Sequence, residues 1–158
     1  MESNKPKIIG LWGKGSRGKT HTLNLVATLL KLNRSATIIQ GQIPIDLSKD
    51  SKYIIEYHNK KIGMVTCGDD GKTLSKAFED IEDDCDLYIC ATRTKDSSVK
   101  FVRKNFYKIL WVEKWGITTE HCELNNIKKL QQKSNEIQAM GIIDIIDEIL
   151  WLILKKMV

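Results

Sequence analysis

Proline is almost absent from this sequence, because only Pro6 and Pro44 occur in 158 residues, and no run of glycine and serine interrupts it. A linker of either kind is the usual sign of a domain boundary, so its absence favours a single domain over residues 1–158. Hydrophobic residues make up 42% and charged residues 28%. That composition argues against a disordered chain and leaves enough apolar material for a buried core.

Cysteine and histidine are also scarce and widely spaced. Four cysteines and three histidines occur, with neither the CxxC nor the CxxH spacing of a structural zinc site, which argues against such a site. Three of the cysteines lie in or beside apolar runs, where we expect small core residues. The first residues, MESNKPK, lack the apolar core of a signal peptide, so we expect a reduced, cytoplasmic protein. The cysteines are Cys67, Cys85, Cys90 and Cys122.

Long apolar runs are missing as well. The most apolar segment, GIIDIIDEILWLILKKMV, is interrupted by acidic residues, and its longest apolar run covers only residues 149–154. A bilayer-spanning helix needs about twenty apolar residues, so a membrane span is not expected. The segment is typical of a helix that covers one face of a sheet. The alternative is a helix that binds a membrane surface or a second copy through Trp151, Leu152, Lys155 and Lys156.

Arginine is rare among the basic residues: four of the 25 lysines and arginines are arginine, and the formal net charge is +5. An excess of this size attracts anionic ligands of any kind. Proteins that read nucleic acids usually cluster arginine on one face, which this sequence does not do, so nucleic-acid binding is not supported.

Apolar segments of strand and helix character alternate along the chain. This alternation predicts an α/β fold, a three-layer α/β/α sandwich with a mostly parallel sheet. Two strand-like segments flank the polar turn 58–61, which predicts a hairpin and one antiparallel strand at the edge of the sheet. The expected strands are 7–12, 36–40, 53–57, 62–67, 87–91 and 109–112, and the expected helices are 18–32, 72–81, 97–104, a short one after residue 123, and a long one over about 135–157.

The segment GKGSRGKT, residues 13–20, lies between the first expected strand and the first expected helix. Glycine lets the backbone wrap around a phosphate group with its N–H groups pointing inward, and the start of a helix adds the positive end of its dipole. Lys19 places an ammonium against the β- and γ-phosphates, and Thr20 offers a hydroxyl to Mg²⁺.

Gly13, Gly18, Lys19 and Thr20 match the Walker A pattern, so the chain resembles the P-loop NTPase superfamily, closely over residues 7–32. The resemblance implies a P-loop NTPase-like fold that binds ATP and Mg²⁺. The nucleotide-binding residues it implies are Gly13, Lys14, Gly15, Ser16, Arg17, Gly18, Lys19, Thr20 and His21, with Lys19 also catalytic.

Lys14 extends the resemblance to the deviant Walker A ATPases, the partition, division-site and arsenite-pump enzymes. In that family a second signature lysine reaches the phosphates across a nucleotide-sandwich dimer, which would make Lys14 catalytic and the protein a homodimer. Ser16 stands where that family commonly has glycine, and the chain lacks the family's usual length and its aspartate-bearing strands. A Lys14 without this role is therefore the alternative.

A carboxylate is expected to complete the magnesium site. Asp69 follows the expected strand 62–67, so we predict that it binds Mg²⁺ together with Thr20. The alternative is that the pair Asp69 and Asp70 caps the next helix, in which case the magnesium carboxylate would be Asp46 or Asp50. Asp46 and Asp50 lie in the polar segment 41–52, where Asp46 would serve either as a general base or as a solvated loop acid.

Arg93 follows another expected strand and should face the phosphate region, since ligands of open α/β sheets bind at the carboxyl ends of the strands. It either neutralises charge on a transferring phosphoryl group, and is then catalytic, or lies on the surface. The nearby Thr94-Lys95-Asp96 lacks the spacing of the guanine-reading motif of GTPases, so ATP is expected rather than GTP.

Together these features predict a Mg²⁺-dependent, ATP-binding P-loop protein, an NTPase that acts as a switch for an unknown protein partner. The alternatives are a small-molecule or nucleotide kinase, and a non-catalytic module that senses nucleotide.

Overall fold

The computed structural model describes residues 7–14, 18–81, 84–117, 120 and 125–156, with side chains up to residue 151. Each expected strand and helix before residue 114 is present, with ends within two residues of those expected. The elements in chain order are β1 (Ile8–Trp12), α1 (Lys19–Asn33), β2 (Thr37–Gly41), β3 (Lys52–Tyr57), β4 (Lys60–Val65), α2 (Gly71–Asp80), β5 (Leu87–Thr92), α3 (Ser97–Asn105), β6 (Ile109–Glu113) and α4 (Ile127–Lys156).

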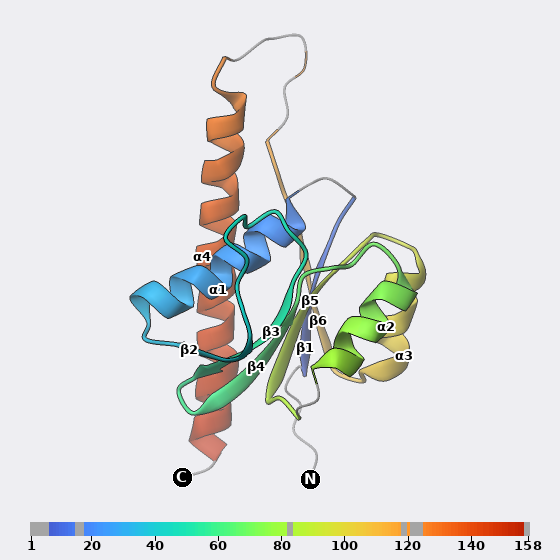
Figure 1. Cartoon of the computed structure of the whole chain (residues 1–158), viewed down its shortest axis with the longest axis vertical. Helices are drawn as coiled ribbons and strands as arrows, with labels where there is room; N and C mark the ends of the chain where they lie inside the picture. The colour runs from blue at the N-terminus through green and yellow to red at the C-terminus, as the bar shows by residue number, and fades with distance from the viewer. Residues whose placement is uncertain (1–6, 15–17, 82–83, 118–119, 121–124, 157–158) are drawn as a thin grey trace.

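The six strands form one sheet in the order β2-β3-β4-β5-β1-β6 (Figure 1). β1 is parallel to both of its neighbours, β5 and β6, and β4 is parallel to β5. Only β3 runs antiparallel to its neighbours, which confirms the mostly parallel sheet with one antiparallel hairpin strand. The expected place of that strand at the edge is wrong, because β2 pairs with its outer side and is itself the edge strand.

The chain reverses its direction between β3 and β4 in a tight hairpin turn. His58 and Asn59 both adopt left-handed backbone conformations, with φ of 52° and 60°. Positive φ at both central residues defines the turn type that matches the twist of paired strands, and asparagine tolerates that conformation well.

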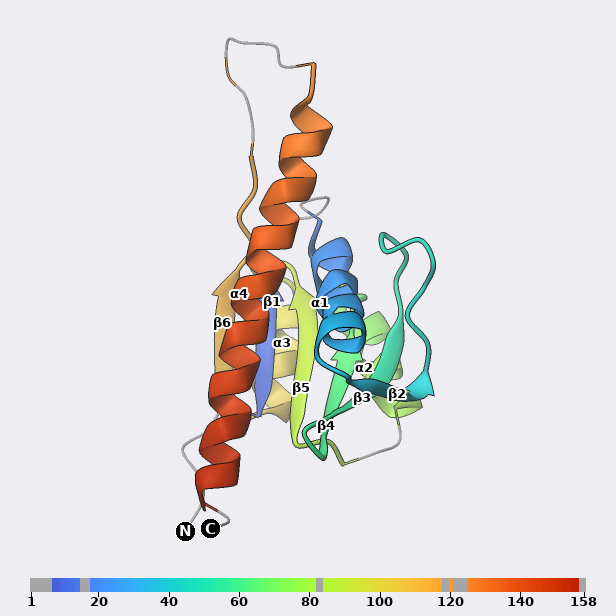
Figure 2. The same cartoon turned by 90° about the vertical axis from the view of Figure 1, so that its left-hand side faces the viewer.

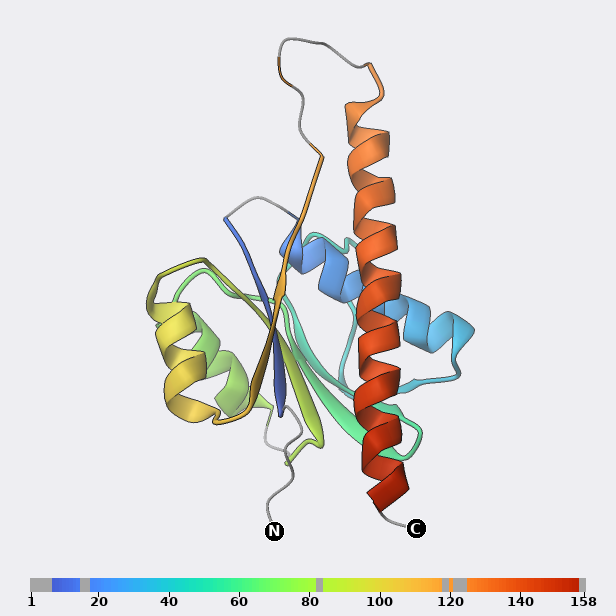
Figure 3. The ribbon, with the colours of Figure 1, turned by 180° about the vertical axis from the view of Figure 1, so that it is seen from behind.

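Helices cover both faces of the sheet (Figures 2 and 3). α1 and α4 pack side by side on one face, where Leu23, Val26 and Leu30 of α1 are fully buried. α2 and α3 pack on the other face, where Leu74 and Val102 are fully buried. This arrangement is compatible with the expected three-layer sandwich.

The last helix corrects the sequence-based expectation. α4 is one continuous helix of 30 residues that begins at Ile127, not a short helix followed by one from about 135. Its first turns extend beyond the carboxyl edge of the sheet (Figures 1 and 3), so they carry no apolar stripe that would have marked them as helix.

The apolar part of α4 does cover the sheet, as expected for such a segment. Ile142, Ile146, Ile149 and Leu150 are all at most 5% exposed in the core shared with α1. Within the described residues, no helix combines the length and the apolar character needed to cross a membrane.

Candidate functional site

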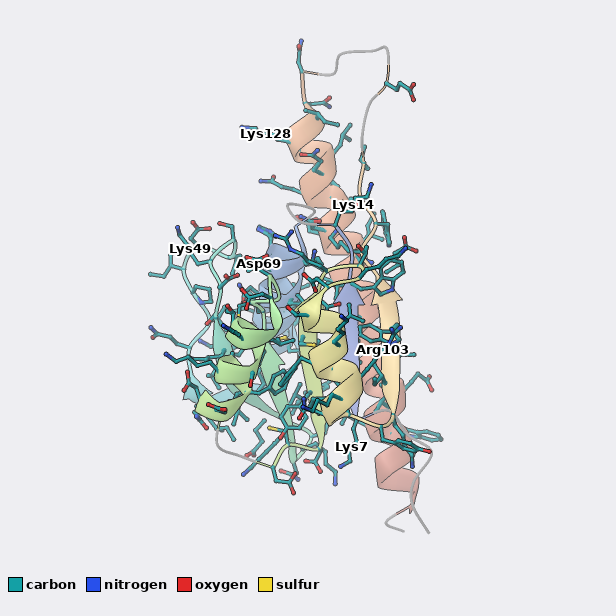
Figure 4. All side chains as sticks on the ribbon, turned by 90° about the vertical axis from the view of Figure 1, so that its right-hand side faces the viewer. Lys7, Lys14, Lys49, Asp69, Arg103 and Lys128 are labelled. Carbon is teal, nitrogen blue, oxygen red and sulfur yellow. The ribbon has the colours of Figure 1, made fainter. Side chains whose placement is uncertain are left out.

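The carboxyl ends of β1, β4 and β5 meet at one edge of the sheet. The N–H of Gly13, directly after β1, donates to the Thr92 carbonyl at the end of β5 over 3.2 Å. Gly68, three residues after β4, approaches β5 so closely that a Cβ there would lie 1.9 Å from the Ala91 carbonyl oxygen. Figure 4 shows Lys14, Lys49 and Asp69 at this end of the molecule and Lys7 at the opposite end.

The loop between β1 and α1 is described at its two ends. Gly15, Ser16 and Arg17, which were expected to bind nucleotide, lie outside the described residues. Gly18 has a φ of 81°, in the left-handed region that favours glycine, and a Cβ there would lie 3.1 Å from Asn135 Nδ2 of α4. The backbone conformation therefore favours glycine at position 18, and a side chain there would also have to displace the Asn135 amide slightly.

Lys19, the first residue of α1, is only 9% exposed. Its ammonium donates to the carbonyl oxygens of Gly13, at 2.6 Å, and Lys14, at 2.8 Å. Burial lowers the pKa of Lys19, and the nearby positive charge of Arg93 lowers it further, against the opposite effects of two aspartates. The ammonium therefore lies between the ends of the loop, held by carbonyl oxygens, while the side chain of Lys14 is exposed.

Thr20 has an unexpected neighbour. Its hydroxyl lies 3.2 Å from Asp50 Oδ1 and 3.1 Å from the Thr66 carbonyl oxygen, and both are acceptors. The Ser51 N–H donates to the Thr66 hydroxyl over 2.7 Å, which ties the segment that carries Asp50 to the end of β4. From the sequence, Asp50 was expected to be a loop acid and, with Asp46, an alternative to Asp69 as the magnesium carboxylate.

Asn24, one helical turn after Thr20, fastens the same segment to α1. Its amide donates to the carbonyl oxygens of Leu47 and Lys49, each over 2.9 Å. Tyr53 in turn donates its hydroxyl hydrogen to Asn24 Oδ1 over 2.8 Å. Asn24 is fully buried. In the sequence it is only a polar residue among the apolar positions of the expected helix 18–32, which does not identify its partners.

The adjacent aspartates after β4 have separate roles. Asp70 caps α2, accepting from the Thr73 N–H over 2.8 Å and from the Thr73 hydroxyl over 3.0 Å, and these bonds lower the pKa of Asp70. Asp69 is exposed, and its Oδ1 lies 3.5 Å from Arg93 Nη2. The capping alternative is therefore correct for Asp70 and not for Asp69. The magnesium role of Asp69 remains a prediction, although the carboxylate in contact with Thr20 is that of Asp50.

Arg93 directly follows β5, at the carboxyl edge of the sheet, and is partly exposed to solvent. Its side chain is 48% exposed, and its guanidinium faces two carboxylates, Asp69 and, at 3.9 Å, Asp96. The positive charge of Arg93 also lowers the pKa of Lys19. Asp96 caps α3 by accepting from the Ser98 N–H over 2.9 Å.

Asp46 and His21 lie at the periphery of the site. Hydrogen bonds from the Ser48 hydroxyl and N–H, at 2.6 and 3.0 Å, hold the pKa of Asp46 below its usual value, with a smaller contribution from His21. A carboxylate with a lowered pKa is a weak general base at neutral pH, so this geometry favours the solvated-acid alternative. His21 is half-buried on α1.

A metal ion at this edge would have few protein ligands. Among the described residues, no group of three or more histidine, cysteine, aspartate or glutamate side chains is placed to hold a metal. Mg²⁺ does not require such a group, because it keeps several waters and is commonly held by one or two carboxylates together with phosphate oxygens. The observed residues fit that mode of binding. No family model, curated protein or solved structure matches this chain.

Proposed function

We propose that the protein binds ATP with Mg²⁺ at the loop 13–20 and hydrolyses it. The observation that carries this proposal is the ammonium of Lys19, buried at the start of α1. Its hydrogen bonds within the described residues go to carbonyl oxygens, and neither goes to a carboxylate. A buried cation is costly unless it is paired with an anion, and a phosphate group would supply one.

The start of α1 supports the same ligand. Its N-cap residue is Gly18, which supplies no capping side chain to the first turn of the helix. The N–H groups of that turn and the positive end of the helix dipole favour a bound anion. Lys19 and these N–H groups would hold the β- and γ-phosphates.

Thr20 and Asp50 are the residues that would serve the magnesium ion, since their oxygens lie 3.2 Å apart at the mouth of the loop. When bound, the magnesium nucleotide supplies the terminal phosphoryl group and the charge that polarises it. Thr20 would ligate the ion, Asp50 would accept hydrogen bonds from its waters, and Arg93 would offset negative charge at the edge of the loop.

The contact between Thr20 and Asp50 supports a switch role. Asp50 belongs to the segment between β2 and β3, which also bonds to Asn24 of α1 and to Thr66 after β4. A ligand at Thr20 would compete with or reorganise this contact and so change a surface segment that a protein partner could read. The kinase and sensing-module alternatives share the same nucleotide site and differ in turnover and acceptor.

Replacing Lys19 by alanine tests the proposal directly. We expect affinity for ATP with Mg²⁺ to fall at least about tenfold, or about 1.4 kcal/mol, in titration calorimetry. Lys31→Ala is the matched control, because it removes the same charge from the far end of the same helix, where Lys31 is exposed. We expect Lys31→Ala to bind ATP as the parent protein does.

Two results would contradict the proposal. Unchanged ATP binding in Lys19→Ala would show that the loop does not hold phosphate. An equal loss of affinity in both variants would show that general positive charge, rather than the loop, attracts the nucleotide. Turnover measured on the same samples, with and without Mg²⁺ and candidate acceptors, separates a hydrolase from a kinase and from a module that binds without reaction.

A further inference from the structure

A cavity lies on the face of the sheet opposite α1, between α3 and the edge strand β6. Its volume is about 550 Å³, within the range of small-molecule pockets. Figure 4 shows Arg103 on α3, beside β6, at this place. The residues that line the cavity are Trp12, Thr94, Lys95, Val99, Arg103 and Trp111.

Two tryptophans form the aromatic part of the lining. Trp111 lies across β1 at Gly10, where a Cβ would be only 2.5 Å from the indole ring, so glycine at position 10 makes room for the ring. Trp12 lies two residues further along β1 and therefore on the same face of the sheet. Both side chains are only half-buried, which leaves aromatic surface accessible from the cavity.

The charge of the lining has one sign. Among the residues that the structure describes, Lys95 and Arg103 are the charged side chains that line the cavity, and none of the lining residues is a carboxylate. The Arg103 guanidinium lies 5.8 Å from the centre of the Trp111 ring, a cation–π distance that holds the cation at the aromatic surface. A pocket that combines flat aromatic walls with two cations is complementary to a flat anion.

A buried hydroxyl lies on the same side of the sheet. Thr92 is opposite Trp12 in the register of β5 and β1, and it follows Cys90, which faces the core under α2 and α3. Thr92 is fully buried, and its Oγ1 has no hydrogen-bond partner in the described part of the chain. Thr92 is not one of the residues that line the cavity, so its hydroxyl belongs to the core beside the cavity and does not contact a ligand there.

We propose that this cavity is a second binding site, for a small aromatic anion: a flat ring that carries a phosphate, sulfonate or carboxylate group. The ring would stack on Trp111 and Trp12, and the acid group would face Arg103 and Lys95. The cavity lies on the opposite face of the sheet from α1, and it adjoins the proposed ATP site, because Trp12 precedes Gly13 and Thr94 follows Arg93. A small molecule fits better than a nucleic-acid strand, since two cations around one cavity do not make a groove that follows a phosphate backbone.

The full-length protein can be tested with 2-naphthalenesulfonate as the probe. Each of the four tryptophans gives its own indole N–H signal in a ¹⁵N–¹H NMR spectrum, and Trp→Phe variants assign the signals. We expect the probe to shift the signals of Trp12 and Trp111 in a saturable way and to leave that of Trp151, at the far end of α4, unchanged. Equal shifts of Trp151 would indicate unspecific binding and overturn the proposal.

Charge and shape controls sharpen the test. We expect Arg103→Gln to weaken binding of the probe at least about tenfold, and Lys104→Gln, the neighbouring exposed cation of α3, to change it less than about twofold. Cyclohexanesulfonate, an anion without an aromatic ring, and 2-naphthylmethylammonium, an aromatic cation, should bind at least about tenfold more weakly than the probe. Equal affinity of either compound, or no effect of Arg103→Gln in a folded protein, would overturn the proposal.

Two further measurements separate this site from its alternatives. The Lys19→Ala variant should bind the probe unchanged, so the cavity can be confirmed even if the ATP proposal fails. Competition between ATP and the probe would instead make the cavity part of the nucleotide site. Tighter binding of a ten-nucleotide single-stranded DNA, with shifts that extend beyond the lining residues, would identify a nucleic-acid surface in its place.

Discussion

Replacing Asp50 by asparagine tests which carboxylate would help to hold a magnesium ion at the loop 13–20. The variant keeps the size of the side chain and removes one negative charge 3.2 Å from the Thr20 hydroxyl. A divalent ion bound to that hydroxyl would lie about 5 Å from the carboxylate, where Coulomb's law with the dielectric constant of water gives about 1.7 kcal/mol. Because 1.36 kcal/mol corresponds to a factor of ten, affinity for Mg²⁺ should fall about 17-fold.

The assay is a magnesium titration at a fixed concentration of a non-hydrolysable ATP analogue, followed by calorimetry. Nucleotide binding without metal should be unchanged or slightly stronger, since a negative charge near the phosphates has been removed. Asp69→Asn makes the same change beside Arg93 instead, and Asp70→Asn makes it at the cap of α2. Both should weaken Mg²⁺ binding less than Asp50→Asn does.

Two results would contradict a magnesium role for Asp50. If Asp69→Asn has the larger effect, the sequence-based assignment is correct and the contact between Asp50 and Thr20 is structural. If all three variants lose Mg²⁺ affinity equally, the local charge of this end of the molecule matters and no single carboxylate does.

Three other changes give further tests. Gly68→Ala should destabilise the protein by at least about 3 kcal/mol in chemical denaturation, because the added Cβ would lie 1.9 Å from the Ala91 carbonyl oxygen; a loss below about 1 kcal/mol would show that the close approach is not required. Lys14→Ala should abolish any increase of mass that ATP and Mg²⁺ cause in light scattering; a protein that stays monomeric with the analogue would retire the sandwich-dimer prediction. Asp70→Asn should keep the hydrogen bond from Thr73 but lose its titration. Since the pKa of Asp70 is lowered in the folded state, the parent protein should be more stable than the variant above the ordinary aspartate pKa of 3.8, and this advantage should disappear as the pH falls through the lowered value.

The parts of the fold that follow local patterns were predictable from the sequence. Gly13 and Gly18 bracket a loop between an apolar strand and a helix, and that spacing placed the loop 13–20 at the carboxyl edge of the sheet. The hairpin followed from two strand-like segments around a polar turn. In each case the signal lies within about a dozen adjacent residues.

Other parts of the site depend on contacts between distant segments, which a single sequence does not encode locally. Asp50 reaches Thr20 because Asn24 and Thr66 hold its segment, and none of these bonds has a periodic signature. Two adjacent aspartates also cannot be told apart by pattern. Only the capping bonds at α2 show that Asp70, and not Asp69, is the one at the helix.

The cavity between α3 and β6 could not be predicted either, because it also depends on contacts between distant segments. It depends on the register between β1 and β6, which sets Gly10 opposite Trp111. A glycine within a buried strand signals a close approach of some kind, but the identity of the neighbour follows only from strand pairing.

The position of β1 between two strands that follow much later in the sequence affects how the protein folds during synthesis. β1 lies between β5 and β6, so its second partner is made about 100 residues after it. Ribosomes add about 5–20 residues per second, so the backbone groups of β1 on that side wait about 5–20 s for their partners. The hairpin of β3 and β4, by contrast, pairs over only a few residues and can form early. β1 is an apolar strand whose partners come late, so chaperones that bind exposed apolar segments should find residues 8–12 accessible on the nascent chain and hidden once residue 113 has left the ribosome.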